Sequence, residues 1–202
     1  MRNRPDDSPA VDPQVTTTTA APSEDTAPED EPGDEPVEPV AEGEGSASLA
    51  KAVLRAGDLP KGWAPLKVAG GVAPLCEGRD PFARVPAAGT ARAGFSKGTS
   101  GDAITGTVAQ YRSTAEAESL LDGMRDDAEA CRRAGTDYTV SSLSGVGDEA
   151  VRLSASVPVG PSTLRVFVTM AREGDHVAVI SATGDPDEAL VVRALKAELG
   201  RL

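Results

Sequence analysis

The alternation of apolar and polar residues predicts a domain built largely of strands. In residues 151–157, Val, Leu and Ala alternate with Arg and Ser, and residues 164–170 show the same alternation. A period of two gives each strand one face toward the core and one face outward. With other segments of strand-like composition and turn-like flanks, the pattern predicts strands over residues 89–97, 102–111, 137–143, 149–157, 163–172 and 176–183.

Three segments have the spacing of helices. Residues 114–133 place their apolar side chains on one face, and they follow Ser113 with Glu116 three positions later, which can form a reciprocal N-terminal cap. A final helix is predicted to begin at 185–188, where Asp-Pro-Asp-Glu supplies a cap, a first-turn proline and carboxylates. A short helix over about residues 47–56 ends before a glycine.

The connections between the strands determine how they pair. Residues 98–101, 159–162 and 173–175 are too short for a crossover, so neighbouring strands are predicted to be antiparallel. We therefore expect an α+β fold, with an antiparallel β-sheet and helices packed on one face. The globular domain is predicted to span residues 47–202.

The N-terminal segment has a different composition. Residues 1–48 contain 13 of the 32 acidic residues, half of the 16 prolines and only two basic residues. Too little apolar surface is present to offset a backbone ordering cost of roughly 1–2 kcal/mol per residue. We predict that residues 1–46 form a disordered acidic tether rich in Pro, Thr and Glu.

The charge of the chain resides mainly in this tether. Residues 49–202 carry 19 acidic and 18 basic side chains, and they show no Lys- or Arg-rich stripe. A domain of this charge releases few phosphate counterions, so we expect no nucleic-acid binding. An alternative function follows from the tail itself, since a cytosolic interaction protein could use it to engage a basic partner.

The sequence gives two indications about location. No run of about 20 apolar residues is present, and the first residues lack the apolar core of a signal peptide. Taken literally, this describes a cytosolic protein. However, a Thr/Pro/Glu/Asp spacer before a domain is also typical of exported bacterial proteins, where it follows a cleaved signal, a lipid-modified cysteine or a membrane helix. On that interpretation the true start lies upstream of Met1, and contact with a membrane requires an anchor that is not present in this chain.

The two cysteines are predicted to form a disulfide. Cys131 lies on the apolar face of the 114–133 helix, and Cys76 lies in a stretch without regular structure. Closing this loop would stabilise the fold by about 4 kcal/mol in the chain-entropy treatment. Two unrelated buried thiols are the alternative. A disulfide would indicate an oxidising compartment.

No catalytic centre is recognisable. His176, the single histidine, adjoins a predicted hairpin turn, and no Gly-x-Ser-x-Gly motif supplies a nucleophile. Asp148 and Glu149 follow a Gly-x-Gly pair, but a strand comes after them, whereas a phosphate loop opens a helix. We interpret this segment as a turn, with a binding cleft as the alternative. Such a cleft would include Trp63, Asp148 and Glu149.

Bound groups and partners are also predicted from these residues. The spacing of the acidic residues on the 114–133 helix is that of a solvated face, so we expect no metal and no cofactor. A carboxylate cleft with enzymatic activity remains an alternative, although we expect no enzyme. The expected protein is a monomer that binds an unknown small ligand or a component of the cell envelope.

Several short segments together resemble a known group of proteins. These are 59–63 (Leu-Pro-Lys-Gly-Trp), Cys76, the helix that ends near Cys131, 145–150 (Gly-Val-Gly-Asp-Glu-Ala) and 172–179 (Arg-Glu-Gly-Asp-His-Val-Ala-Val). They are similar to segments of exported actinobacterial proteins, many of them lipoproteins, whose domain resembles the extracellular sensor domain of PknH-type serine/threonine kinases.

This resemblance covers residues 47–202. It implies an antiparallel sheet with helices on one side, a cleft for an unidentified small ligand, and a location outside the cytoplasmic membrane. The chain departs from the kinase-type sensors in having two cysteines, enough for one disulfide where they carry two. It also has no kinase domain, membrane helix or lipobox cysteine, so the resemblance does not imply a mode of anchoring.

Overall fold

The computed structural model describes residues 38–68, 81–159, 162–185 and 187–202. The predicted tether lies mostly outside these residues, as does Cys76. All described residues belong to a single compact unit. In chain order its elements are β1 (Val40–Gly43), α1 (Ser46–Ala52), a 3-10 helix (Ala56–Asp58), β2 (Trp63–Leu66), α2 (Pro81–Arg84), β3 (Gly89–Lys97), β4 (Asp102–Gln110), α3 (Thr114–Arg133), β5 (Tyr138–Ser142), β6 (Glu149–Val159), β7 (Ser162–Glu173), β8 (His176–Gly184) and α4 (Glu188–Leu199).

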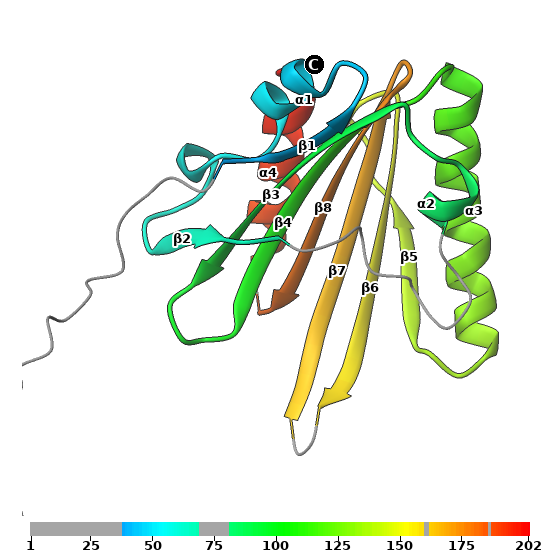
Figure 1. The fold of residues 1–202 in the computed structure, drawn as a ribbon. Coiled ribbons are helices and arrows are strands. Elements are labelled where there is room, and N and C mark those ends of the chain that lie inside the picture. Colours follow the sequence, from blue (N-terminus) through cyan, green and yellow to red (C-terminus); the bar gives the residue numbers. More distant parts are fainter. Residues whose placement is uncertain (1–37, 69–80, 160–161, 186) are drawn as a thin grey trace, which may run out of the picture. The chain divides into compact units, whose positions relative to one another are not determined.

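The eight strands form one antiparallel sheet, which confirms the predicted α+β class (Figure 1). The strand order is β1-β3-β4-β8-β7-β6-β5, and β2 also pairs with β3. Strand β8 therefore inserts between β4 and β7, and the chain of hairpins from β5 to β8 runs inward from one edge of the sheet. Strand β5 forms that edge, because β6 is its partner in the sheet.

The helices pack on both faces of the sheet, and the prediction that they share one face is wrong. Helix α3 packs against Val177 and Val179 of β8. Helix α4 packs against Ala178 and Ile180 of the same strand. Because successive side chains of a strand point to opposite faces, these two helices lie on opposite sides. Helix α2 joins α3, since Phe82 packs on the same cluster.

Helix α1 shares the face of α4. Its residues Leu49 and Val53 pack against Val108 of β4. Val108 lies four positions after Ile104, which belongs to the cluster beneath α4, so both side chains point to the same face of the sheet. The physical reason for the two-faced arrangement is the composition of β8, whose residues 177–180 are apolar and buried on both sides. A strand buried on both faces has a continuous apolar run in place of an alternation.

Helix α3 begins and ends where the sequence predicts. The Oγ of Ser113 accepts a hydrogen bond from the backbone N–H of Glu116 at 3.2 Å, and the Glu116 carboxylate accepts one from the N–H of Arg112 at 3.1 Å. After Arg133 a short link through Gly135, which has φ +101°, returns the chain as β5. A link this short sets β5 beside the helix that precedes it, and Figure 1 shows the two elements together at one side of the sheet.

The opposite edge of the sheet contains two strands that the sequence pattern did not predict. Strands β1 and β2 each have four residues and pair with successive halves of β3. Strand β1 comprises residues 40–43, which fall inside the segment predicted to be a tether. Gly43 has φ +88°, and a Cβ at this position would lie 2.3 Å from the carbonyl oxygen of Ala88. Glycine therefore permits the tight approach of β1 to the start of β3.

Candidate ligand groove between α3 and β5

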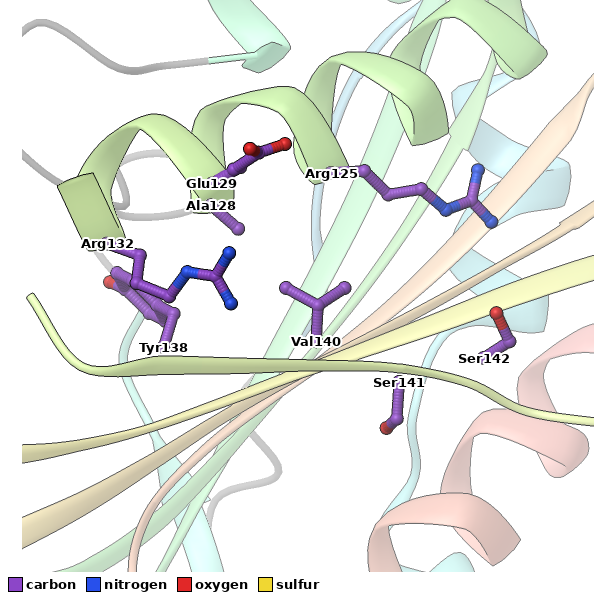
Figure 2. Close-up of a pocket in the computed structure, with 8 residues that line it drawn as sticks. All are labelled: Arg125, Ala128, Glu129, Arg132, Tyr138, Val140, Ser141 and Ser142. Atoms are coloured by element: carbon purple, nitrogen blue, oxygen red, sulfur yellow. The ribbon is translucent and has the colours of Figure 1, made fainter.

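A groove with a volume of about 270 Å³ separates the C-terminal half of α3 from β5 (Figure 2). We call it the α3–β5 groove. Its lining comes from four helix residues and four strand residues. They are Arg125, Ala128, Glu129, Arg132, Tyr138, Val140, Ser141 and Ser142.

Local geometry explains which side chains reach this groove. The helix residues are spaced three, one and three positions apart, so they form a strip along one side of α3. On β5, Figure 2 shows Val140 on the side of the strand that faces the helix and Ser141 on the other side. The period of a strand thus places the Val140 side chain in the groove.

The groove combines an apolar floor with polar walls. Ala128 is fully buried at its base, and the side chain of Val140 is 41% exposed. The Tyr138 ring is partly buried, and this burial raises the pKa of its hydroxyl above the ordinary value of 10.0. At neutral pH the hydroxyl therefore keeps its proton and can donate a hydrogen bond.

The charges that line the groove are not equally compensated. Arg125 binds Glu149 through Nη2 at 2.6 Å and Asp122 through Nη1 at 3.0 Å. Glu129 lies 4.0 Å from Arg133.

The guanidinium of Arg132 is different, because no acceptor for it occurs among the described residues. Arg132 is therefore the cation of this groove that is available to a ligand. A guanidinium presents its donors in a planar fork that matches a carboxylate or a phosphate.

The residues predicted for a cleft are not brought together. Glu149 reaches the rim of the α3–β5 groove through its contact with Arg125. Asp148 accepts hydrogen bonds from the N–H of Gly174 at 2.9 Å and from Arg172 at 3.1 Å, so it holds the neighbouring turn. These two adjacent carboxylates thus bind different partners.

Trp63 lies at the other end of the sheet. It pairs with Lys97 at the end of β3, whereas Glu149 pairs with Arg172. Its side chain is partly buried against the cluster beneath α4. A cleft formed by Trp63 together with the two carboxylates is therefore absent among the described residues.

Only one of the two cysteines that were predicted to pair lies among the described residues. Cys131 lies on the buried side of α3 with no exposed surface, and no free cysteine occurs among the described residues. Cys76 lies outside those residues. The pairing of the two cysteines stays a prediction.

A second polar arrangement lies under α4, among side chains that are mostly apolar. Glu198 is fully buried, and its Oε1 accepts a hydrogen bond from the N–H of Leu54 at 2.8 Å. Burial raises its pKa well above the ordinary value of 4.5, and the nearby Asp58 carboxylate acts in the same direction. The Leu54 N–H and the Arg201 guanidinium oppose this increase. Burial therefore favours the neutral form of this carboxyl group.

Arg201 makes further contacts in the same region, closer to the solvent. It binds both carboxylate oxygens of Asp58, at 2.9 and 3.0 Å, and donates to the carbonyl oxygens of Ala52 and Val53. The C-terminal end of α4 is thus tied to the segment that follows α1. Sequence spacing contained the signal for Glu198, because position 198 lies seven residues after the buried Val191 and on the same side of the helix.

Two further properties concern the described part of the chain. No helix there is long and apolar enough to cross a membrane. Within the same residues, no group of three or more His, Cys, Asp or Glu side chains is placed to hold a metal ion.

Comparisons with known proteins identify a structural likeness. No protein-family model matches the chain, and no curated protein matches it in sequence. Its structure is similar to the crystal structure of the extracellular domain of PknH from Mycobacterium tuberculosis, with a TM-score of 0.54 and 11% sequence identity. The likeness covers 76% of this chain and 94% of that domain. At this identity the two proteins share a fold.

Proposed function

We propose that this protein is a non-enzymatic, sensor-like domain that binds a small ligand or a component of the cell envelope outside the cytoplasmic membrane. The acidic N-terminal segment serves as its flexible stalk. Similarity in fold to an extracellular domain supports the location and the sensor-like role. We assign ligand binding to the α3–β5 groove.

The observation that supports this assignment is that the Arg132 guanidinium has no acceptor among the described residues. A solvent-accessible guanidinium without an acceptor in the described chain stands beside an apolar floor, so a ligand with an anionic group gains both an ion pair and apolar contact. His176, by comparison, contacts Asp175 at 2.9 Å through Nδ1. Among the described residues, no hydroxyl or thiol donates a hydrogen bond to that histidine. This arrangement favours binding over nucleophilic chemistry.

Amide chemical shifts of the isotope-labelled full chain would test the assignment. A mixture of small carboxylates and phosphates should shift amides of residues 138–142 and of the second half of α3. Shifts confined to another surface would contradict this site. Turnover of any compound at the groove would contradict the non-enzymatic role.

We also propose that Cys76 and Cys131 form a disulfide, which suits an extracytoplasmic location. The complete burial of Cys131 and the lack of a free cysteine among the described residues support it. Intact-mass measurement after alkylation should show no adduct on exported material and two adducts after reduction under denaturing conditions. Alkylation of both thiols without reduction would contradict the disulfide and the compartment inferred from it.

A further inference from the structure

The outer edge of β5 presents free backbone groups. The N–H of Leu143 donates to the carbonyl oxygen of Ala150 at 3.1 Å, and in an antiparallel ladder every second residue makes such bonds to its partner strand. The N–H and C=O groups of Val140 and Ser142 therefore point away from β6. No other described strand pairs with β5 at this edge.

The two edges of the sheet differ in how they are protected. The edge at β3 is covered by two strands of four residues each, and β2 contains Pro65. Short strands and prolines are common means of preventing further strand pairing. Strand β5 reads Tyr-Thr-Val-Ser-Ser, with neither a proline nor a charge. Its free edge can therefore accept another strand.

The groove lies beside this edge and on the side of β5 that faces α3. Alternate side chains of a strand added to β5 would point toward α3, next to Val140 and the guanidinium of Arg132. Main-chain hydrogen bonds would supply affinity, and the groove would select the side chains.

We propose that the α3–β5 groove binds an extended acidic peptide, which pairs with the free edge of β5 and places a carboxylate on Arg132. This inference rests on the proposed function and specifies the chemistry of its ligand. The guanidinium of Arg132 is the reason for an acidic side chain. The exposed Val140 is the reason for an apolar residue two positions away on the same face.

A second copy of this chain fits the edge less well than such a peptide. In Figure 2, Arg132 and Arg125 lie at opposite ends of the groove. Antiparallel pairing of two β5 strands about Val140 would turn the Arg132 end of one groove toward the Arg125 end of the other. At that end the carboxylates of Asp122 and Glu149 already bind Arg125, so a second copy would bring Arg132 no unbound carboxylate.

The probe is a fluorescein-labelled peptide, Thr-Val-Thr-Glu-Thr-Val-Thr-Glu, titrated with the full chain in a polarisation assay. Its Val and Glu residues occupy one face. Two N-methylated versions each block the N–H groups of one edge of the peptide. Methylation of the edge that pairs with β5 should abolish binding, and methylation of the other edge should leave it within about twofold. Replacing both Glu residues with Lys should weaken binding by about tenfold or more.

Two pairs of protein variants test the same contacts. Arg132→Gln should weaken binding by about tenfold, because it removes a charge-assisted hydrogen bond. Arg133→Gln is the matched control on the same turn, and it should change affinity by less than about twofold. Val140→Pro removes an N–H that faces the open edge and should abolish binding, whereas Val140→Thr keeps that N–H and should retain it. Circular dichroism verifies that each variant is folded.

Several results would overturn the inference in distinguishable ways. If Val140→Pro and both methylated peptides bind like their parents, strand addition is wrong, although a ligand site in the groove survives. If the peptide fails to bind while inorganic phosphate shifts the groove amides, the ligand is a small anion and only the peptide is refuted. Self-association that Val140→Pro abolishes would identify a second copy as the occupant. If no probe shifts the groove amides, the proposed function loses its site as well.

Discussion

The two faces of the sheet use buried space differently. Under α3 the core cluster is apolar, and the buried charge on this helix is Asp127, which is 1% exposed and binds Arg84 of α2. Under α4 the core encloses the carboxyl group of Glu198, and Arg201 binds Asp58 beside it. The α3 face opens at β5 into a groove, whereas the α4 face encloses the Glu198 carboxyl group, whose pKa is raised by burial. The α3 face thus contains the groove that we propose as the ligand site, whereas on the α4 face Glu198 and Arg201 join distant segments of the chain.

Truncation of the core should cost about the same on either face, and this is the largest effect we expect. Leu121 lies under α3 and Leu195 under α4, and neither is exposed. Leu121→Ala and Leu195→Ala should each lower the free energy of unfolding by about 2–5 kcal/mol, because each leaves a cavity in a packed core. Urea denaturation provides the measurement. Val140→Ala, at a 41% exposed position, is the control and should cost about 0.5 kcal/mol or less.

If Leu121→Ala proved nearly neutral, the α3 face would be a loose layer and not a second core. If Leu195→Ala were neutral, the original expectation of helices on one face would regain support. The comparison therefore depends on both measurements together.

Close approach of the chain under α4 predicts the next largest effect. A Cβ on Gly106 would lie 2.1 Å from Oε1 of Glu198 and 2.5 Å from the Cβ of Leu54. Gly106→Ala should therefore destabilise the protein by about 1–3 kcal/mol through overpacking. Gly57→Ala is the matched control, since a Cβ there meets nothing within 4 Å. Equal thermal midpoints for the two variants would show that β4 does not hold Glu198 closely.

Sequence reasoning succeeded where local pattern and local chemistry agree. Strand β3 and helix α3 have the predicted bounds, because turn glycines delimit the strand and a capping serine begins the helix. Strands β1 and β2 escaped prediction, since four residues without alternation form strands only when β3 offers an edge. The apolar run 177–180 did contain the signal for two covered faces, and the expectation of one face ignored it.

The candidate site was harder to predict for a related reason. The helix and the strand that form the groove were both predicted, and the short link between them implies that they lie side by side. The availability of Arg132, however, depends on which acids its neighbours bind. Arg125 is paired with Glu149, 24 positions away, on a strand whose register is set by the whole sheet. Such a pairing cannot be derived from local spacing.

The raised pKa of Glu198 under α4 predicts a dependence of stability on pH. The pKa of Glu198 is raised in the folded state, so its contribution is fully present below the ordinary value of 4.5 and is lost as the pH rises from there through the folded pKa. Stability should decline across this window by at most about 1.4 kcal/mol per pH unit, the limit for the uptake or release of one proton. Glu198→Gln, which retains an acceptor for Leu54, should flatten the profile.

Glu173→Gln at the exposed β7–β8 turn is the control, and it should keep the slope. The measurement is urea denaturation of all three proteins between pH 5 and 8, a range in which exposed Asp, Glu, Lys and Arg side chains titrate little. A slope that persists in Glu198→Gln would assign the dependence to other groups and would leave the two faces alike in this respect.

The smallest effects concern the caps that begin the two long helices. Ser113 caps α3 with a neutral hydroxyl, whereas the Oδ1 of Asp187 caps α4 by accepting from the N–H of Ala189 at 3.0 Å. Removing either acceptor should cost about 1 kcal/mol, and Asp187→Ala should cost a few tenths more, since a negative charge also interacts favourably with the helix dipole. Thermal unfolding at low and high salt separates the two contributions, because salt screens only the charge.

Ser119→Ala, in the middle of α3, should be neutral or slightly stabilising, because alanine has the higher helix propensity. If Asp187→Ala cost no more than Ser113→Ala at low salt, the α4 face would derive no benefit from charge at its surface, and its electrostatic character would reside in Glu198 and Arg201 alone.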